Sequence, residues 1–255
     1  MKIGFISDIH EDIQSLEKAL DILSGEGCDN IVCLGDITGF VLPFYRYIPV
    51  RNTEACIKFV RQKCSVVVAG NHDLYAARRI PKFSAGFEYG DNWYNTDYKI
   101  RAKRAQNKIW LYEDGELPVL LSGESSSFLM GLNELERVDF GSISFLFSHF
   151  CYPDFSGSTI HFPAEANHLR THFEYMQSLG CIIGVSGHGH PEGFIIVSED
   201  EFKFYPFGTY QLRREIQWIV VPCVARTMRS NGVLIIDSES MKITAIRIHK
   251  IKPFF

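Results

Sequence analysis

Residues 66–73 constrain the fold of this chain more than any other stretch. Three consecutive valines and an alanine are followed at once by Gly70, Asn71, His72 and Asp73. An unbroken run of β-branched residues predicts a strand buried on both faces, as in the middle of a parallel sheet. Ligands of open α/β sheets bind at the carboxyl ends of strands, and Gly70 would let the backbone approach one closely. The stretch therefore predicts a strand that presents polar groups to a site, although Asn and Asp are also common turn residues.

The same pattern, an apolar run that stops at Asp, Asn or His, occurs at four other places. Counting the stretch at 66–73, five strand-end segments hold five of the nine histidines, which a random scatter would not produce. Each short motif is weak alone because it matches by chance, whereas the ordered set is a strong signal. The four further segments contain Asp8 with His10, Gly35 with Asp36, His149, and His188 with His190.

These residue types indicate metal chemistry. Carboxylate, imidazole and amide oxygen ligands suit divalent Mn, Fe, Co, Ni or Zn rather than a soft thiolate site. Two such cations would need a bridging carboxylate, and their charge would exceed that of two aspartates. The site would then be a local positive centre in a chain of net charge −4. Such a centre suits a phosphate group.

Composition limits the classes of protein that remain. The 255 residues, 46% hydrophobic and 22% charged, are enough for one large domain or two small ones. We expect a single domain over residues 1–255, with a polar, aromatic and basic insertion at about 78–113. The acidic balance argues against a nucleic-acid surface, so we expect no nucleic acid beyond nucleotides or short oligonucleotides.

The chain also lacks the signals of membrane and secreted proteins. No apolar run approaches membrane-spanning length. The first residues do not resemble a signal peptide, and the seven cysteines form no paired motifs. These features predict a reduced, cytoplasmic protein.

Hydrophobic periodicity predicts a βαβ unit at the start of the chain, with strands at 3–6 and 30–34. Apolar residues at helical spacing lie between these two strands. Further helices are predicted at 53–63, about 96–112 and about 163–178. Further strands are predicted at 118–121, 127–130, 143–147, 181–185, 193–197, 202–205, 217–221, 232–236 and 243–248.

With these motifs in place, the chain resembles the calcineurin-like metallophosphoesterase superfamily. The superfamily pattern D-x-H, G-D, G-N-H-D/E, H, G-H-x-H is matched at every position across residues 8–190. The short chain and the second motif resemble the small bacterial and archaeal phosphodiesterase-like branch. The resemblance implies an α/β fold, a four-layer α/β/β/α sandwich with a small helical insertion.

The resemblance also implies a centre of two divalent metal ions, drawn from Mn, Fe, Zn, Co or Ni. The first ion would be held by Asp8, His10, Asp36 and His190. The second would be held by Asp36, Asn71, His149 and His188. A bridging hydroxide would be the nucleophile, because metals lower the pKa of bound water.

The catalytic residues implied by the resemblance are His72, Asp36 and Asn71. His72 would donate to the leaving oxygen or to the phosphate. Asp73 is expected to orient the backbone or a ligand histidine rather than to bind metal.

The second motif departs from that of the superfamily's Ser/Thr protein phosphatases. Those continue it with Asp-Arg-Gly, whereas Ile37, Thr38 and Gly39 follow Asp36 here. The acid that would partner His72 and the arginine that would grip phosphate are missing from this position. This argues against a protein phosphatase and leaves the protonation of His72 open.

The sequence therefore predicts a metal-dependent phosphoesterase acting on a small phosphodiester, nucleotide or phosphomonoester. The alternative is a non-catalytic protein-interaction scaffold on the same fold. The small retromer subunit, a relative of this fold, resembles such a protein-interaction module. His168 and His172 have a zinc-compatible spacing, but without a third ligand a surface role is expected. Arg226 and Arg229 would be near enough to meet an anionic substrate, although a surface role is expected for them too.

Overall fold

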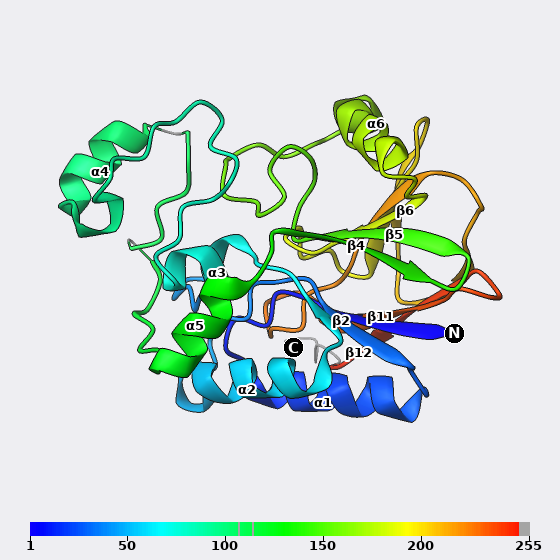
Figure 1. Cartoon of the computed structure of the whole chain (residues 1–255). Helices are drawn as coiled ribbons and strands as arrows, with labels where there is room; N and C mark the ends of the chain where they lie inside the picture. The colour runs from blue at the N-terminus through cyan, green and yellow to red at the C-terminus, as the bar shows by residue number, and fades with distance from the viewer. Residues whose placement is uncertain (107, 114, 250–255) are drawn as a thin grey trace.

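The structure is a computed structural model that describes residues 1–106, 108–113 and 115–249. Two six-stranded sheets lie face to face, with helices on the outer face of each (Figure 1). This arrangement confirms the four-layer α/β/β/α sandwich. Across the described ranges, every helix is too short or too polar to span a lipid bilayer.

The first sheet has the strand order β3-β2-β1-β11-β12-β9. Its strands are β1 (Lys2–Ile6), β2 (Asn30–Cys33), β3 (Val66–Val67), β9 (Gly208–Gln211), β11 (Gly232–Asp237) and β12 (Lys242–Arg247). Strands β1, β2 and β3 run parallel, while β11 is antiparallel to both β1 and β12. The predicted parallel βαβ unit at the start of the chain is therefore confirmed.

The second sheet has the strand order β4-β5-β6-β10-β7-β8. Its strands are β4 (Leu135–Phe140), β5 (Ile143–Ser148), β6 (Ile183–Ser186), β7 (Phe194–Val197), β8 (Phe202–Tyr205) and β10 (Gln217–Val220). Strands β5, β6 and β10 are parallel neighbours in the middle of this sheet. Strands β4 and β9 were not predicted.

The helices cover the sheets on both sides. They are α1 (Ile13–Gly25), α2 (Thr53–Lys63), α3 (Asn71–Ala76), α4 (Tyr98–Ala105), α5 (Gly123–Gly131) and α6 (Arg170–Ser178). Three 3-10 helices complete the set: Ile48–Val50, Trp93–Asn95 and Ala166–Leu169. In Figure 1, α1 and α2 lie beneath the first sheet, α6 lies above the second, and α4 projects at the upper left.

The alternation of side chains along the strands builds three cores. Phe5 of β1 and Phe145 of β5 point between the sheets, where they are fully buried. Their chain neighbours point the other way: Ile6 packs with α1 and α2, and Leu146 packs with α6. Because side chains alternate across a strand, each central strand of the two sheets is buried on both faces. This packing on both faces holds the ends of the central strands in place.

The stretch at 66–73 was placed wrongly within its sheet. Strand β3 is the edge strand of the first sheet, and its two residues are only half-buried. Beyond the strand, the Val68 N–H still donates to the Cys33 carbonyl of β2, and Val68 also forms an isolated bridge with Asn133. A run of valines therefore predicted a strand correctly but overestimated its burial.

Four other predictions on element type or length are wrong. Residues 127–130 form part of helix α5, which begins where the Ser122 side chain accepts from the Ser125 N–H. Residues 118–121 lie outside any strand. Helix α4 spans only Tyr98–Ala105, and α6 begins at Arg170 rather than near residue 163. In α5, the local Ser122 cap outweighed the hydrophobic pattern.

Candidate metal centre

Four strand ends and one helix start converge on a single site. Asp8 and Asp36 lie just after the ends of β1 and β2, while His149 and His188 lie just after the ends of β5 and β6 in the facing sheet. Within the second sheet, the Gly187 N–H after β6 donates to the His149 carbonyl after β5 at 3.0 Å. The His188 N–H crosses to the first sheet and donates to the Asp8 carboxylate at 3.0 Å. Residues far apart in the chain therefore meet because both sheets end at the same edge.

Three overlapping groups of side chains could each hold a cation. The possible ligand atoms within each group lie within 4.8 Å of one another. The groups are Asp8 with His10 and His190; His10 with Asp36 and His72; and Asp36 with His149 and His188. Asp36 belongs to two of the groups. Its Oδ2 lies 3.0 Å from the His149 Nε2 and 3.9 Å from the His10 Nε2.

Unpartnered atoms indicate that these groups fit cations. Among the residues that the structure describes, the buried Asn71 Oδ1 and His188 Nε2 have no hydrogen-bond partner. Buried polar atoms are normally satisfied, so each orphan calls for an explanation. An amide oxygen and an imidazole nitrogen are both good ligands for divalent transition metals. The donor set of nitrogen and oxygen atoms therefore fits such ions.

Backbone carbonyls orient two of the candidate ligand histidines. The Nδ1 of His149 lies 2.7 Å from the Leu34 carbonyl, and the Nδ1 of His10 lies 2.7 Å from the Gly39 carbonyl. A carbonyl only accepts, so each Nδ1 carries the hydrogen and each Nε2 faces the site. This is the usual support of a metal-binding histidine.

The backbone of the site is conformationally unusual. Asp8, His10, Asp36, His188 and His190 all have positive φ angles, between 44° and 62°. Left-handed backbone costs a non-glycine residue roughly 1–2 kcal/mol. Such strain persists only where the surrounding structure imposes it, and it concentrates at functional sites. The tight turns bring side chains from consecutive strand ends to one point.

The electrostatics of the carboxylates favour the ionised form. Burial opposes ionisation of Asp36, but the neighbouring His149 and His72 hold the pKa of its carboxyl far below the usual range. Asp8 behaves alike: burial is outweighed by His190 and His149, and its pKa is also lowered. Both carboxylates are therefore charged at any pH near neutrality.

The imidazoles divide into two kinds when the protein's own charges are considered. Burial lowers the pKa of His10 and of His188 to about 3. Both imidazoles are therefore neutral, which is the form that binds a metal ion. Burial also acts on His149, but Asp36 outweighs it and raises the pKa to about 10. The proton on His149 is therefore the one that a bound cation would have to displace.

Asp73 does not point at the candidate cation site. Its Oδ1 accepts from the backbone N–H groups of Ile37 and Thr38 at 2.9 and 3.1 Å. Its Oδ2 accepts from the Gly70 N–H at 3.1 Å. Asp73 thus ties the turn after β2 to the start of α3, and the prediction that it orients backbone is confirmed.

Two residues near the site were missed by sequence reasoning. The Glu116 carboxylate lies 2.6 Å from the His72 Nδ1, and the Tyr112 hydroxyl accepts from the Asn71 Nδ2 at 3.1 Å. Burial would lower the pKa of His72, but the negative charges of Asp36 and Glu116 outweigh it and raise this pKa to about 9. No motif marks either residue, and the only clue was the missing acid after Asp36.

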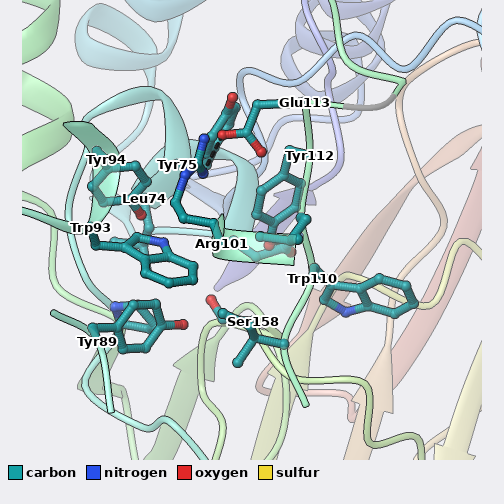
Figure 2. Close-up of a pocket in the computed structure, with 14 residues that line it drawn as sticks. Leu74, Tyr75, Tyr89, Trp93, Tyr94, Arg101, Trp110, Tyr112, Glu113 and Ser158 are labelled. Atoms are coloured by element: carbon teal, nitrogen blue, oxygen red, sulfur yellow. Dashed lines mark hydrogen bonds and ion pairs between the residues drawn. The ribbon is translucent and has the colours of Figure 1, made fainter. Parts of the chain in front are cut away.

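An aromatic cavity adjoins the site on the side of α4. Figure 2 shows rings of Tyr75, Trp93, Tyr94 and Tyr112 around it, with the Arg101–Glu113 ion pair at one end. Its volume of about 20 Å³ is enough for a water molecule. Side chains from α3 and from the segment that precedes Glu116 line this cavity together, so the two segments pack against each other.

The remaining candidates from the sequence are His168 with His172 and Arg226 with Arg229. His172 is fully buried, where its Nδ1 accepts from the Tyr152 N–H at 3.0 Å, so the expected surface role is wrong. Neither it nor His168 joins a possible metal group within the described residues. Arg226 pairs with buried Asp12 rather than reaching the site. The Arg229 guanidinium reaches its rim, 3.4 Å from the His190 carbonyl.

Two stacked sheets thus gather carboxylates and imidazoles at one edge, as the sequence motifs predicted. The family model for calcineurin-like phosphoesterases matches residues 1–192. The chain therefore belongs to the calcineurin-like phosphoesterase family, as its motifs predicted.

Individual relatives are distant. An uncharacterized protein of Methanocaldococcus jannaschii is 34% identical over 71 residues, which is 28% of this chain and 26% of that protein. A metallophosphoesterase from Sphaerobacter thermophilus has the same fold, with a TM-score of 0.64 at 20% identity, covering 98% of this chain and 88% of that one. A hypothetical protein from Pyrococcus horikoshii gives a TM-score of 0.60 at 15% identity, covering 98% and 89%.

Proposed function

We propose that this protein hydrolyses a small phosphodiester, nucleotide or phosphomonoester at a centre of two divalent cations. The observation that carries the proposal is the position of Asp36, which belongs to two of the three possible ligand groups. A carboxylate has two oxygens and is well suited to bridging two ions.

The residues divide between the two cation sites. Around Asp36, one site would take Asp8, His10 and His190, and the other would take Asn71, His149 and His188. When bound, two such cations would supply an activated water and positive charge for the phosphoryl oxygens.

The protein's other groups hold the substrate and handle protons. His72 stands beside the cage, where its backbone N–H donates to the Asp36 Oδ1 at 2.9 Å. We assign His72 to donating a hydrogen bond or a proton toward the ester. Arg229 at the rim is the candidate cation for a charged substrate.

The alternative, a protein-interaction scaffold, has less support. A scaffold has no need of ligands, yet all seven predicted metal ligands are present, and two of them keep buried atoms without a protein partner. Strained backbone at five of the seven also argues for a retained site.

The test is hydrolysis of p-nitrophenyl phosphate and bis-p-nitrophenyl phosphate by the purified protein with Mn²⁺, Zn²⁺, Fe²⁺, Co²⁺ or Ni²⁺. We expect turnover with at least one ion and two bound ions per chain by elemental analysis. Asp36→Asn should lower both activity and metal content. Asp139→Asn, an exposed carboxylate on β4, should change neither. Absence of turnover with every ion, with no metal retained, would favour the scaffold.

A further inference from the structure

Glu116 lies at the end of the segment that follows α4, far from every sequence motif. Its side chain is buried, with 2% exposed, against 14% for His72. The backbone on both sides of it is held: the Leu42 N–H donates to the Gly115 carbonyl, and the Leu117 N–H donates to the Phe40 carbonyl. These backbone hydrogen bonds fix the position of Glu116 independently of its contact with His72.

The His72 ring is confined on its other sides as well. A Cβ on Gly39 would lie 2.4 Å from the ring, so the ring packs directly on that backbone. Tyr112 and His10 contact it edge-on, with ring centroids 4.9 and 5.0 Å away. Glu116 occupies Nδ1 at 2.6 Å. Rotation is blocked, and Nε2 is the nitrogen left to meet a substrate.

We propose that Glu116 is the positioning residue for His72 in the hydrolytic reaction. It takes the place of the acid that is missing after Asp36, but it comes from a different part of the chain. With Nδ1–H donated to Glu116, the Nε2–H of His72 is directed to the leaving oxygen. This inference rests on the proposed hydrolysis.

The proton balance is simple. As the bond from phosphorus to the leaving oxygen breaks, the proton on Nε2 passes to that oxygen. The attacking water supplies the new phosphorus–oxygen bond, and the proton that it releases restores the ring. Glu116 keeps its charge throughout and only holds Nδ1–H.

The rival role for Glu116 is also defined by geometry. A His72 nitrogen lies within 4.8 Å of ligand atoms of His10 and Asp36, so His72 is itself a possible metal ligand. Glu116 would then support metal binding, as outer carboxylates do. The two roles differ in what is lost when Glu116 changes.

Glu116→Gln keeps the size of the side chain and removes its charge. We expect kcat to fall roughly 100-fold for phenyl or alkyl phosphate esters, whose leaving oxygens need a proton. For p-nitrophenyl esters, whose leaving group is stable as an anion, the fall should be only a few-fold. Bound metal should be unchanged. The matched control is Glu134→Gln, another buried glutamate, paired with Arg79 away from the site.

An equal loss for all leaving groups would overturn the proposal, as would a loss of bound metal. Adding Glu116→Gln to His72→Asn should cost nothing further on poor leaving groups, because Glu116 acts only through His72. Additive losses would also overturn it.

A measurement without turnover separates this inference from the proposed function. In the metal-free protein, nitrogen-15 NMR of the histidine rings should show His72 with its hydrogen on Nδ1 in a strong hydrogen bond. Glu116→Gln should remove that signal and Glu134→Gln should keep it. A His72 ring that does not respond to Glu116→Gln overturns the pairing even if the protein hydrolyses esters. An intact pairing with no hydrolysis would overturn the proposed function and, with it, the role in catalysis.

Discussion

The guanidinium of Arg226 donates two hydrogen bonds of 2.8 Å to the buried carboxylate of Asp12. The same carboxylate accepts from the Ser15 N–H and so caps helix α1. Asp12 is fully buried, whereas the Arg226 side chain is 32% exposed. The pair joins the start of α1 to the segment after β10.

Arg226→Met is therefore expected to destabilise the protein without touching the chemistry. Removing the guanidinium leaves the Asp12 charge buried without an ion-pair partner, although Asp12 keeps hydrogen bonds from Ser15, and we expect a cost of about 3 kcal/mol. Urea denaturation should show this loss in the free energy of unfolding. Arg229→Met, at the rim, should leave stability unchanged and raise KM. A stable Arg226→Met protein would show that Asp12 is satisfied in another way.

Gly70→Ala should disable the centre by steric conflict alone. Gly70 has an ordinary φ of −92°, but a Cβ there would lie 2.1 Å from the Asp36 Oδ1. We expect displacement of that carboxylate and loss of bound metal, measured by elemental analysis. Gly131→Ala in α5, where a Cβ meets nothing within 4 Å, is the control. Full metal content in Gly70→Ala would mean that Asp36 is not needed for binding.

Metal binding should stabilise the fold, because the cage exists only in the folded chain. An ion at 100 times its Kd adds about 2.7 kcal/mol to the free energy of unfolding. Thermal denaturation with Mn²⁺ and with a chelator should therefore give different Tm values. In Asp36→Asn this difference should shrink. An equal rise in both proteins would point to ions bound elsewhere.

Stability should fall as the pH drops below about 6.5, partly because of His172. Burial lowers its pKa in the folded protein to about 3, whereas an unfolded histidine titrates near its model value of 6.5. The unfolded chain therefore binds a proton first, and stability present above pH 6.5 is lost on acidification. This group accounts for about 2 kcal/mol between pH 7.5 and 5.0.

His172→Gln keeps an acceptor for the Tyr152 N–H but cannot take up a proton. Its free energy of unfolding should depend less steeply on pH over that range, as measured by urea denaturation at each pH. An unchanged slope would show that His172 protonates inside the folded protein.

Much of the fold and most of the site could be read from local signals. Apolar strands followed by Asp, Asn or His were recognisable in the sequence, because each candidate ligand directly follows the strand that positions it. The edge position of β3 and the helix at 123–131 could not be read in this way. The burial of β3 depends on strands that are distant in the chain, whereas the α5 cap from Ser122 to Ser125 is local and was overlooked in favour of the apolar pattern.

The amino-acid order by itself determined the family, the layered fold and the seven side chains that could hold cations. Only the tertiary structure decided how those side chains are supported. Glu116 reaches His72 across 44 residues, and Arg226 reaches Asp12 across 214. Such pairs leave no periodic or motif signal, since a hydrogen bond between distant segments depends on where the packed sheets bring the two atoms and not on their spacing along the chain.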